Sequence, residues 1–310
     1  RLNSKGGDGN SPYHAYFVTG ADEHGEKIAK TAQADGKEPM EICNKYVTGF
    51  QVLNQRTLVT NDDYTRTTSE RHKRTAHALW NRCAANDDIY LDNYSGWYNV
   101  KEETFVTDSE AELCNYCDPA SGQPLQRVQE ASYFFKMSKY HERLVEHINK
   151  NVEFIQPEAH RNLILARLDS DKLRDLSISR TTFTHGIPVP EGFESNHVMY
   201  VWFDALTNYL SALNFPNLKS NLFKEYWPAS VHMIGKDILR FHAIYWPAFL
   251  LAAEIDPPKN IFGHGWILSG DEKMSKSKGN ILDPLEIIKT YGLDPLRYYL
   301  IKEVSFGNDG

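Results

Sequence analysis

The amino-acid sequence of 310 residues predicts an α/β protein built on a parallel, doubly wound sheet. Short apolar runs alternate along most of the chain with helical patterns, which is typical of parallel strands covered by helices. Glycine and polar residues follow several of these runs directly, and ligands bind at the carboxyl ends of parallel strands. Residues 92–176 differ, because short alternating segments and turn-forming residues there predict antiparallel strands. We therefore expect an inserted subdomain at 92–176.

The first half of the sheet domain is expected at residues 1–91. An apolar run at 15–19 predicts a strand, and helix-like sequence follows it. Apolar side chains at spacings of three and four then predict two amphipathic helices, of which the first begins near Pro39. The first helix is expected to carry Ile42, Tyr46, Phe50 and Leu53, and the second Ala76, Leu79, Trp80 and Cys83.

The second half of the sheet domain is expected at residues 177–265. Residues 197–203 and 231–234 are predicted to be buried strands, each followed by a helix. Pro247 lies inside the second helical pattern and is expected to kink it, because proline lacks the backbone N–H and crowds the preceding turn. A last strand is expected to begin at Asn260.

The composition restricts the classes of function. A formal net charge of −7 provides no basic surface for general nucleic-acid binding, so DNA is not expected as a partner. No apolar run has the length of a membrane span, and no signal peptide is recognisable. We expect a soluble, intracellular protein without a membrane partner, in the cytoplasm or the mitochondrial matrix. The cysteines are too few and scattered for a disulfide scaffold; they are Cys43, Cys83, Cys114 and Cys117.

The segment 272–280 has the sequence Glu-Lys-Met-Ser-Lys-Ser-Lys-Gly-Asn and follows an apolar run. Lysine side chains on long stems can follow a phosphate as it moves, while serine and glycine let the backbone come close to it. The segment is therefore a candidate phosphate-binding loop. The alternative interpretation is a solvated charged loop, which most lysine runs are.

A strand-to-helix turn at residues 235–237 is a candidate nucleotide site. Gly235 lets a nucleotide approach the backbone, and the carboxylate of Asp237 can accept hydrogen bonds from both ribose hydroxyls. The alternative for Asp237 is a carboxylate that stabilises the start of a helix.

Aromatic and apolar side chains on two helical segments form a second candidate site. These residues are Ile238, His242 and Trp246 on one helix face, and Trp202, Ala205 and Tyr209 around Asp204. An apolar slot with one phenol and one imidazole suits a thioether side chain, because sulfur packs well on aromatic rings. The alternative is that both sets belong to the core.

These motifs together resemble methionyl-tRNA synthetase, over nearly the whole chain and in the order of that family. The resemblance is carried by residues 19–25, 176–180, 200–205, 235–238, 241–247, 264–266 and 273–277. The lysine loop alone marks a class I aminoacyl-tRNA synthetase, whereas the segments around Trp202 and His242 select methionine among the amino acids.

The resemblance implies ATP-dependent activation of L-methionine to methionyl-AMP, followed by transfer to the 3′ end of tRNA(Met), with Mg²⁺ as the counter-ion of ATP. The implied catalytic residues are Lys273, Lys276 and Arg180. Methionine would be bound by Asp22, which holds its ammonium group, and by Trp202, Ala205, Tyr209, Ile238, His242 and Trp246. ATP would be bound by Gly235, Asp237, His264, Gly265 and Lys276.

The resemblance also implies a Rossmann-type sheet split by a connective-peptide insert, with the lysine loop and the start of a tRNA stem-contact region at residues 266–310. The family's His-Ile-Gly-His turn does not occur in the sequence. It is expected upstream, just as the anticodon-binding domain is expected downstream. We therefore expect a fragment whose activity requires its N-terminal segment.

A zinc site is not expected in the insert. Zinc-bearing relatives hold two Cys-x-x-Cys pairs, but here Asn99 and Glu102 occupy the positions of one pair. Only Cys114 and Cys117 remain as weak candidates, and structural zinc requires four good ligands.

Two other functions are weighed against this prediction. One is a class I synthetase for another apolar amino acid, which amino-acid-dependent exchange of pyrophosphate into ATP would detect. The other is a non-catalytic, synthetase-like protein that binds tRNA or a partner, which the upstream coding sequence would decide.

Overall fold

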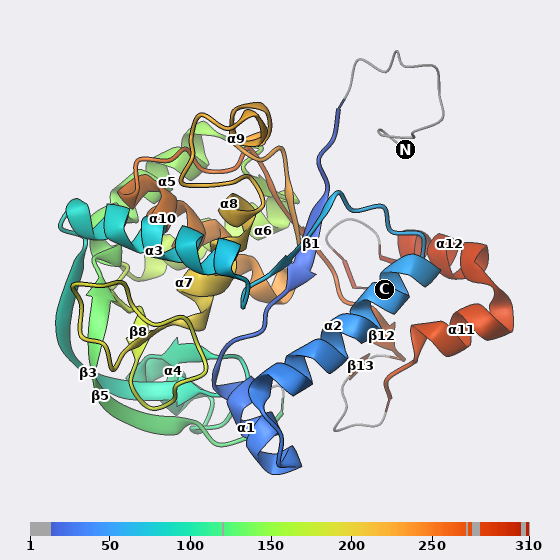
Figure 1. The fold of residues 1–310 in the computed structure, drawn as a ribbon, viewed down its shortest axis with the longest axis horizontal. Helices are drawn as coiled ribbons and strands as arrows, with labels where there is room; N and C mark the ends of the chain where they lie inside the picture. Colours follow the sequence, from blue (N-terminus) through green and yellow to red (C-terminus); the bar gives the residue numbers. More distant parts are fainter. Residues whose placement is uncertain (1–13, 120, 271, 275–279, 305–307, 310) are drawn as a thin grey trace.

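The computed structural model describes residues 14–119, 121–270, 272–274, 280–304 and 308–309 (Figure 1). The expected parallel pairing of strands is confirmed, but the parallel strands form two groups. In the first group β1 (Val18–Ala21) pairs with β2 (Asp63–Arg66). In the second the order is β10 (His232–Gly235), β11 (Ile261–His264) and β6 (Ile155–Gln156). No strand of the described ranges joins the two groups, so β1 and β10 each pair along one edge only.

Three helices follow the first strands: α1 (Glu26–Asp35), α2 (Pro39–Arg56) and α3 (Glu70–Ala85). The prediction for α3 is confirmed, because its four predicted core side chains are fully buried. Helix α2 also begins at Pro39 as predicted, and a capping box between Glu38 and Glu41 stabilises its first turn. However, Tyr46 and Phe50 are 42% and 52% exposed, so the apolar stripe of α2 lies only partly in the core.

An antiparallel sheet occupies most of the range predicted for the insert, in the order β4-β3-β5-β7. Its strands are β3 (Ile89–Asn99), β4 (Thr104–Val106), β5 (Gln126–Phe135) and β7 (Leu176–Ser177), and helix α4 spans Asp108–Leu113. Strand β6 lies within the same range of the sequence, yet it pairs with β11 of the parallel group. The range 92–176 therefore contributes to both sheets.

The remaining elements alternate short strands with helices. They are η1 (Met137–Tyr140), α5 (His141–Lys150), α6 (Glu158–Ser170), β8 (Ser179–Arg180), β9 (Val198–Met199), α7 (Val201–Leu206), α8 (Asn208–Ser211), α9 (Asn221–Tyr226), η2 (Lys236–Ile238), η3 (Phe241–Tyr245), α10 (Trp246–Ala252), β12 (Leu268–Ser269), β13 (Glu272–Lys273), α11 (Pro284–Tyr291) and α12 (Leu293–Glu303).

The strand predicted at 197–203 is wrong over most of its length. Only β9 is extended, and it pairs antiparallel with β8 instead of joining the parallel strands. Helix α7 already begins at Val201, and the N–H of Asp204 donates to the carbonyl of Tyr200 at 3.1 Å. The error has a physical reason, because a short apolar run that is buried on all sides fits a strand and a buried helix equally well.

The helical pattern after Lys236 is interrupted, as predicted from Pro247. A 3₁₀ turn, η2, is followed by a π-helical turn, η3, and α10 begins immediately afterwards with Pro247 in its first turn. Proline has no N–H to donate, so the turn before it can widen without losing a hydrogen bond.

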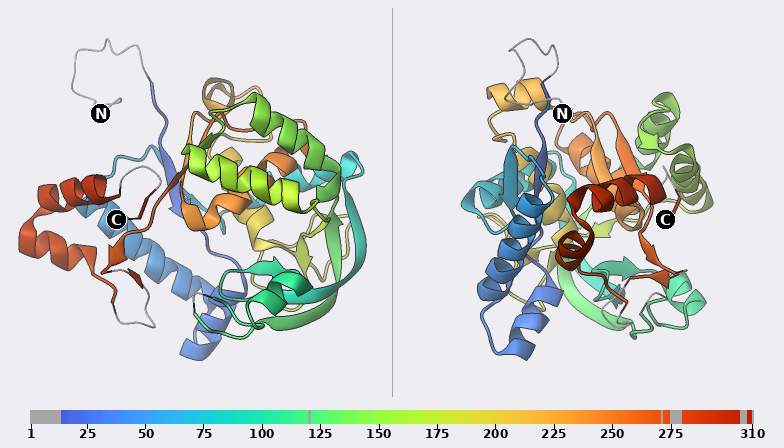
Figure 2. Two further views of the ribbon diagram at one scale, coloured as in Figure 1. Left: turned by 180° about the vertical axis from the view of Figure 1, so that it is seen from behind. Right: turned by 90° about the vertical axis from the view of Figure 1, so that its right-hand side faces the viewer.

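Helices α11 and α12 lie beside α2, and the left view of Figure 2 shows them on the opposite side of the molecule from β3 and β5. Arg297 of α12 donates to the carbonyl oxygen of Thr57 at 2.6 Å, just beyond the end of α2. Among the described residues, no helix combines the length and the apolar character that crossing a membrane requires.

Candidate active site

The predicted slot for a thioether side chain contains a hydrogen-bonded pair, Tyr209 and His242. The hydroxyl oxygen of Tyr209 lies 2.8 Å from Nε2 of His242, and Nδ1 of His242 lies 3.0 Å from the carbonyl oxygen of Ile238. Because a carbonyl can only accept, Nδ1 carries the proton and Nε2 accepts from the Tyr209 hydroxyl. Burial lowers the pKa of His242 to about 4, so the imidazole is neutral near pH 7.

Aromatic rings form the walls of this slot. Trp202 stacks on Phe241 with ring centroids 3.7 Å apart and an interplanar angle of 6°. The Trp202 ring lies 6.5 Å from that of His242, and the Trp246 ring lies 6.0 Å from that of Tyr209. The structure therefore brings together side chains from α7, α8, η3 and α10 that the sequence assigned to one slot. The buried Nε1 of Trp202 has no hydrogen-bond partner among the described residues.

His232 packs against the residues of the predicted slot, and sequence analysis missed it. Its ring stacks on that of Tyr209 at 3.8 Å, and its Nε2 accepts a hydrogen bond from Nε1 of Trp246 at 3.2 Å. Burial lowers its pKa well below the ordinary value, and the neighbouring His242 acts in the same direction. The available signal was the alternation along β10, where His232 and Ile234 are buried while Met233 is exposed.

A buried carboxylate, Asp204, connects α7 with two other parts of the chain. Its oxygens lie 2.6 Å from Nδ1 of His24 and 2.7 Å from Nε2 of His72. On its other side, Nδ1 of His72 lies 3.2 Å from the hydroxyl of Ser211. His24 and His72 lie 180 and 132 residues before Asp204 in the sequence, so no local sequence pattern could predict these contacts.

Asp22 follows strand β1 directly and lines a cavity of about 450 Å³. Its side chain is exposed to solvent at the wall of this cavity. Desolvation by the surrounding protein, together with the nearby carboxylates of Asp204 and Glu103, raises the pKa of Asp22 well above its ordinary value. A cation that enters the cavity would find a carboxyl group with few other partners.

The predicted nucleotide residues meet at the carboxyl ends of β10 and β11. Gly235 and His264 are paired in the parallel register of these strands. A Cβ atom on Gly235 would lie 2.8 Å from Oδ1 of Asp237, so a larger residue would press on this carboxylate. Oδ1 of Asp237 also accepts from Nε1 of Trp266 at 3.1 Å, and Nδ1 of His264 lies 2.8 Å from the carbonyl oxygen of Gly265.

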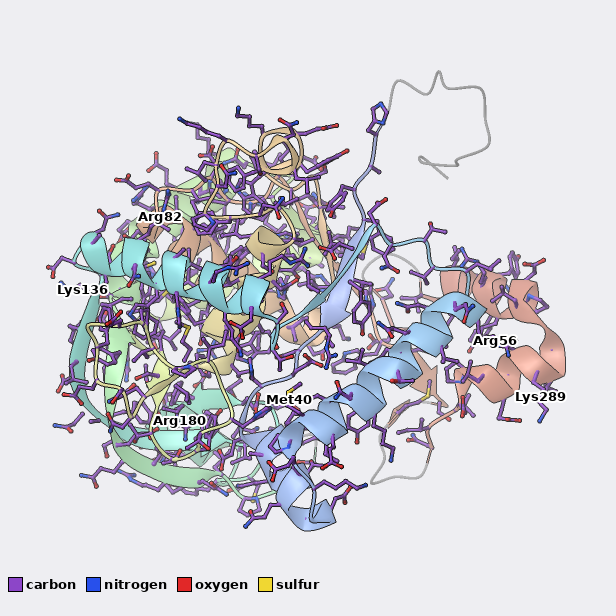
Figure 3. The ribbon with its side chains drawn as sticks, viewed as in Figure 1. Met40, Arg56, Arg82, Lys136, Arg180 and Lys289 are labelled. Carbon is purple, nitrogen blue, oxygen red and sulfur yellow. The ribbon has the colours of Figure 1, made fainter. Side chains whose placement is uncertain are left out.

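Arg180 lies on β8 and is almost fully buried (Figure 3). Its Nε donates to Glu130, its Nη2 donates to the hydroxyl of Thr182 at 3.1 Å, and its guanidinium carbon lies 4.2 Å from the centre of the Tyr98 ring. Its Nη1 is buried without a hydrogen-bond partner in the described part of the chain. Much of its charge is therefore balanced inside the protein, and its electrostatic role in catalysis stays a prediction.

The lysine loop is described only at its start. Lys273 belongs to β13, which pairs antiparallel with β12, and Lys276 lies outside the described residues. Along the chain, β12 and β13 follow β11, and β11 ends at His264, one of the predicted nucleotide-binding residues.

The insert carries the four positions considered for zinc. Oδ1 of Asn99 accepts from the backbone N–H groups of Lys101 and Glu102 at 3.1 and 3.2 Å, so its side chain closes a turn. Cys114 donates to the carbonyl oxygen of Ala111 at 3.4 Å. Within the described ranges, no group of three or more His, Cys, Asp or Glu side chains could hold a metal ion.

Comparisons with known proteins identify relatives of this chain. The family model described as "tRNA synthetases class I (M)" matches residues 9–310. The methionine–tRNA ligase of Halalkalibacterium halodurans is 45% identical over 307 residues, which cover 96% of this chain and 46% of the relative. That of Mycobacterium tuberculosis is 47% identical over 300 residues, covering 96% of this chain and 57% of the relative. The chain thus spans about half the length of these curated relatives.

A solved structure is similar over the same range. The crystal structure of M. tuberculosis methionyl-tRNA synthetase bound by methionyl-adenylate superimposes with a TM-score of 0.91 and 46% sequence identity. The match covers 96% of this chain and 58% of that structure.

Proposed function

Since the chain belongs to the family of class I tRNA synthetases for methionine, we propose that it forms the catalytic region of a methionine–tRNA ligase. The reaction is the activation of L-methionine by ATP to methionyl-AMP and pyrophosphate, followed by transfer of the methionyl group to the 3′ end of tRNA(Met). The observation that carries the proposal is the slot in which Tyr209 donates to a neutral His242 between the rings of Trp202 and Trp246.

The chemistry of the slot supports methionine over other apolar amino acids. A thioether sulfur is polarisable and packs favourably against aromatic rings, which leucine and valine do not exploit to the same degree. The slot presents several rings and two polar groups that already bond to each other, so a side chain without strong hydrogen-bonding groups leaves them satisfied. Ala205 and Ile238 complete the apolar lining in the proposal.

Asp22 binds the ammonium group of methionine in the proposed complex. The carboxyl end of β1 and the N-terminus of α7 are held together by the contact between His24 and Asp204, so Asp22 is kept near the slot. An ammonium ion favours the ionised carboxylate, and it would offset the desolvation that now raises the pKa of Asp22.

ATP lies at the carboxyl ends of β10 and β11 in the proposal. Asp237 accepts from the ribose hydroxyls, Gly235 allows the close approach of the nucleotide, and His264 with Gly265 borders the adenine. Lys273 and Lys276 neutralise charge on the triphosphate while the methionine carboxylate attacks the α-phosphorus, and Arg180 adds a positive potential. Mg²⁺ enters as the counter-ion of ATP.

We also propose the domain assignment that the sequence suggested, but with a shorter insert than residues 92–176. The β3–β5 sheet and α4 form the connective-peptide insert between the halves of the catalytic domain, residues 1–91 and 177–265, and residues 266–310 begin the stem-contact region. The parallel pairing of β6 with β11 supports an insert that is smaller than the range 92–176, because β6 then belongs to the catalytic domain.

Amino-acid-dependent exchange of pyrophosphate into ATP tests the proposal. The protein expressed from its complete reading frame should catalyse exchange with L-methionine at a rate far above that with leucine or valine. Preferred activation of leucine or valine would replace the proposal by another class I synthetase. Binding of tRNA without exchange for any of these amino acids would replace it by a non-catalytic, synthetase-like protein.

A further inference from the structure

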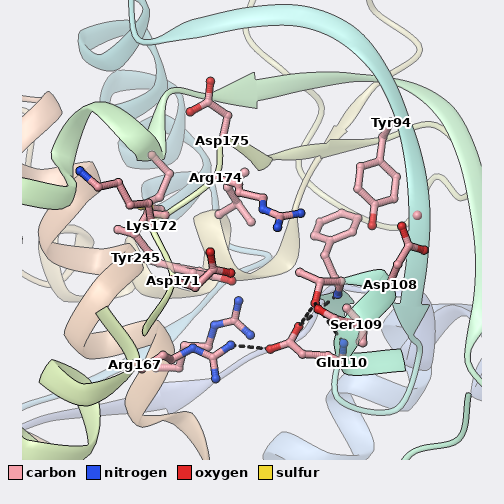
Figure 4. A pocket seen from close by; sticks show the side chains of 18 of the residues that line it. Tyr94, Asp108, Ser109, Glu110, Arg167, Asp171, Lys172, Arg174, Asp175 and Tyr245 are labelled. Carbon is pink, nitrogen blue, oxygen red and sulfur yellow. Dashed lines mark hydrogen bonds and ion pairs between the residues drawn. The ribbon is translucent and has the colours of Figure 1, made fainter. Parts of the chain in front are cut away.

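A cavity of about 420 Å³ lies between the insert and the catalytic side of the molecule, apart from the slot and the nucleotide residues (Figure 4). Its walls come from β3, β4 and α4, from the segment between α6 and β7, and from the turn that joins η2 to η3. Eight charged side chains line it: Arg167, Lys172, Arg174 and Arg240, and Asp108, Glu110, Asp171 and Asp175.

Most of the acidic groups in this cavity already have partners. Glu110 accepts from the N–H and hydroxyl of Thr107 and from Nη2 of Arg167, the last at 2.6 Å (Figure 4). Asp175 accepts from the N–H and hydroxyl of Ser138 and from the hydroxyl of Tyr90.

Two further charged groups in the lining contact residues outside the cavity. Asp108 lies 3.8 Å from Arg127, and Lys172 lies 2.9 Å from Glu142. Within the described ranges, Asp171 is the one acidic group of the lining without a side-chain hydrogen bond or ion pair.

Two arginines of the lining differ from the rest. In the part of the chain that the structure describes, no carboxylate oxygen lies within 4 Å of the guanidinium nitrogens of Arg174 or Arg240. Arg174 is exposed, and Figure 4 shows it pointing into the cavity from the segment before β7. Arg240 is partly buried, and its guanidinium carbon lies 5.5 Å from the centre of the Tyr245 ring. Although desolvation opposes its charge, Tyr245 and the nearby carboxylate of Glu110 attract the guanidinium, and the pKa of Arg240 stays above its ordinary value.

We propose that this cavity binds the phosphate group of a small ligand, with Arg174 and Arg240 as its principal contacts. A guanidinium presents its N–H groups in a planar fork that matches phosphate oxygens. Two guanidinium groups without a carboxylate oxygen of the described residues within 4 Å outweigh the single carboxylate of Asp171. The volume suits a ligand of mononucleotide size at most, since pockets for small molecules begin at about 300 Å³.

The position of Arg240 gives such a ligand a route to the proposed active site. Arg240 immediately precedes Phe241 and His242, whose rings contact Trp202 and Tyr209 in the slot. A phosphate that orders Arg240 therefore also orders the start of η3. This effect depends on the proposed function, whereas phosphate binding itself does not.

Titration calorimetry with inorganic phosphate tests the site. The wild-type protein should bind phosphate, and Arg174→Gln and Arg240→Gln should each weaken this binding about tenfold or more, because each removes a charge-assisted contact. Arg56→Gln is the matched control, since Arg56 is exposed at the far end of α2 (Figure 3), and it should bind phosphate like the wild type. Thermal unfolding without ligand shows whether each variant is folded; because Arg174 is exposed, Arg174→Gln decides the matter if Arg240→Gln fails to fold.

Two further probes define the ligand class. If adenosine monophosphate binds the wild type more tightly than phosphate does, and if Arg174→Gln abolishes this binding, the ligand is a mononucleotide. If the two probes bind with equal affinity, the site recognises phosphate alone. Acetate binding as tightly as phosphate would contradict the phosphate assignment. The proposal is also overturned if the wild type binds no phosphate, or if all four proteins bind it equally.

Discussion

Oδ2 of Asp204 lies 2.6 Å from Nδ1 of His24, and this buried contact joins helix α7 to the segment that follows strand β1. The other oxygen of Asp204 holds His72 of α3, so one carboxylate connects three elements. Helix α7 carries Trp202 of the proposed methionine slot, and the segment after β1 carries Asp22. The distance between the proposed ammonium site and the slot therefore depends on Asp204.

We expect Asp204→Asn to destabilise the protein by about 3 kcal/mol, because one histidine N–H loses its acceptor and the buried network loses its charge. Chemical denaturation measures the loss. Any folded Asp204→Asn protein should also show a higher KM for methionine with little change in the KM for ATP. Asp87→Asn, which removes an exposed carboxylate paired with Lys136, should change neither quantity. If Asp204→Asn is as stable as the wild type, the hydrogen bonds of Asp204 do not contribute to the free energy of unfolding.

The pairing of Tyr209 and His242 leads to a prediction about specificity. Tyr209→Phe keeps a ring against His232 but removes the hydroxyl that donates to Nε2 of His242. An unsatisfied buried acceptor costs about 1–3 kcal/mol, so the KM for methionine should rise about tenfold or more in the exchange assay.

Tyr226→Phe is the control for that experiment, because Tyr226 stacks on Tyr16 away from the slot. It should leave the KM for methionine unchanged. If Tyr209→Phe also leaves it unchanged, the hydroxyl of Tyr209 does not organise the methionine site.

Asp22→Asn should make the protein more stable at neutral pH while abolishing methionine activation. The pKa of Asp22 is raised in the folded protein, chiefly by desolvation, so the folded state binds this proton more tightly than the unfolded state does. Stability is therefore lost as the pH rises from the ordinary value of the group through its folded value. Asparagine removes that loss together with the charge that holds the ammonium group. Urea denaturation at pH 7 measures the stability, and the exchange assay measures activation. A less stable Asp22→Asn protein, or one that still catalyses methionine-dependent exchange, would contradict the prediction.

Much of the candidate site could be predicted because its residues are close in sequence. Trp202 and Tyr209, and likewise His242 and Trp246, lie within two helical turns, where spacing alone indicates a shared face. Asp204, His24 and His72 meet across more than a hundred residues, and only the folded chain brings them together.

The errors in the fold have a similar origin. Residues 200–203 are apolar without a period, and burial on all sides removes the alternation that separates a strand from a helix. The division of the parallel strands into two groups could not be predicted either. The apolar run at 15–19 predicts a strand but does not indicate which other strand it pairs with.

Glu103 should give the protein a pH-dependent stability near neutrality. Its carboxylate accepts from the N–H of Lys27 in the first turn of α1, yet burial raises its pKa from 4.5 to about 7. The folded state therefore keeps a proton that the unfolded state releases, and stability falls as the pH rises from about 4.5 through 7, by at most about 3 kcal/mol.

Glu103→Gln should lose the part of the pH dependence that Glu103 contributes in denaturation curves between pH 5 and 8, while Asp22 still contributes a dependence of the same sign. Glu102→Gln, at the exposed neighbouring position, should keep the wild-type curve. Identical pH profiles for all three proteins would remove Glu103 as the source.

Lys276→Ala should separate chemistry from binding. Lys276 lies outside the described residues, and its role comes from its place in the loop that begins at β13. If its charge stabilises the triphosphate only as the α-phosphorus is attacked, removing it should slow formation of methionyl-AMP about a hundredfold or more, as the loss of one oxyanion-hole donor does. Methionine affinity should stay within about twofold, because uniform binding does not involve this lysine. Stopped-flow measurement of adenylate formation gives the rate, with Lys302→Ala on exposed α12 as the control that should match the wild type. An unchanged rate in Lys276→Ala would exclude this lysine from the transition state.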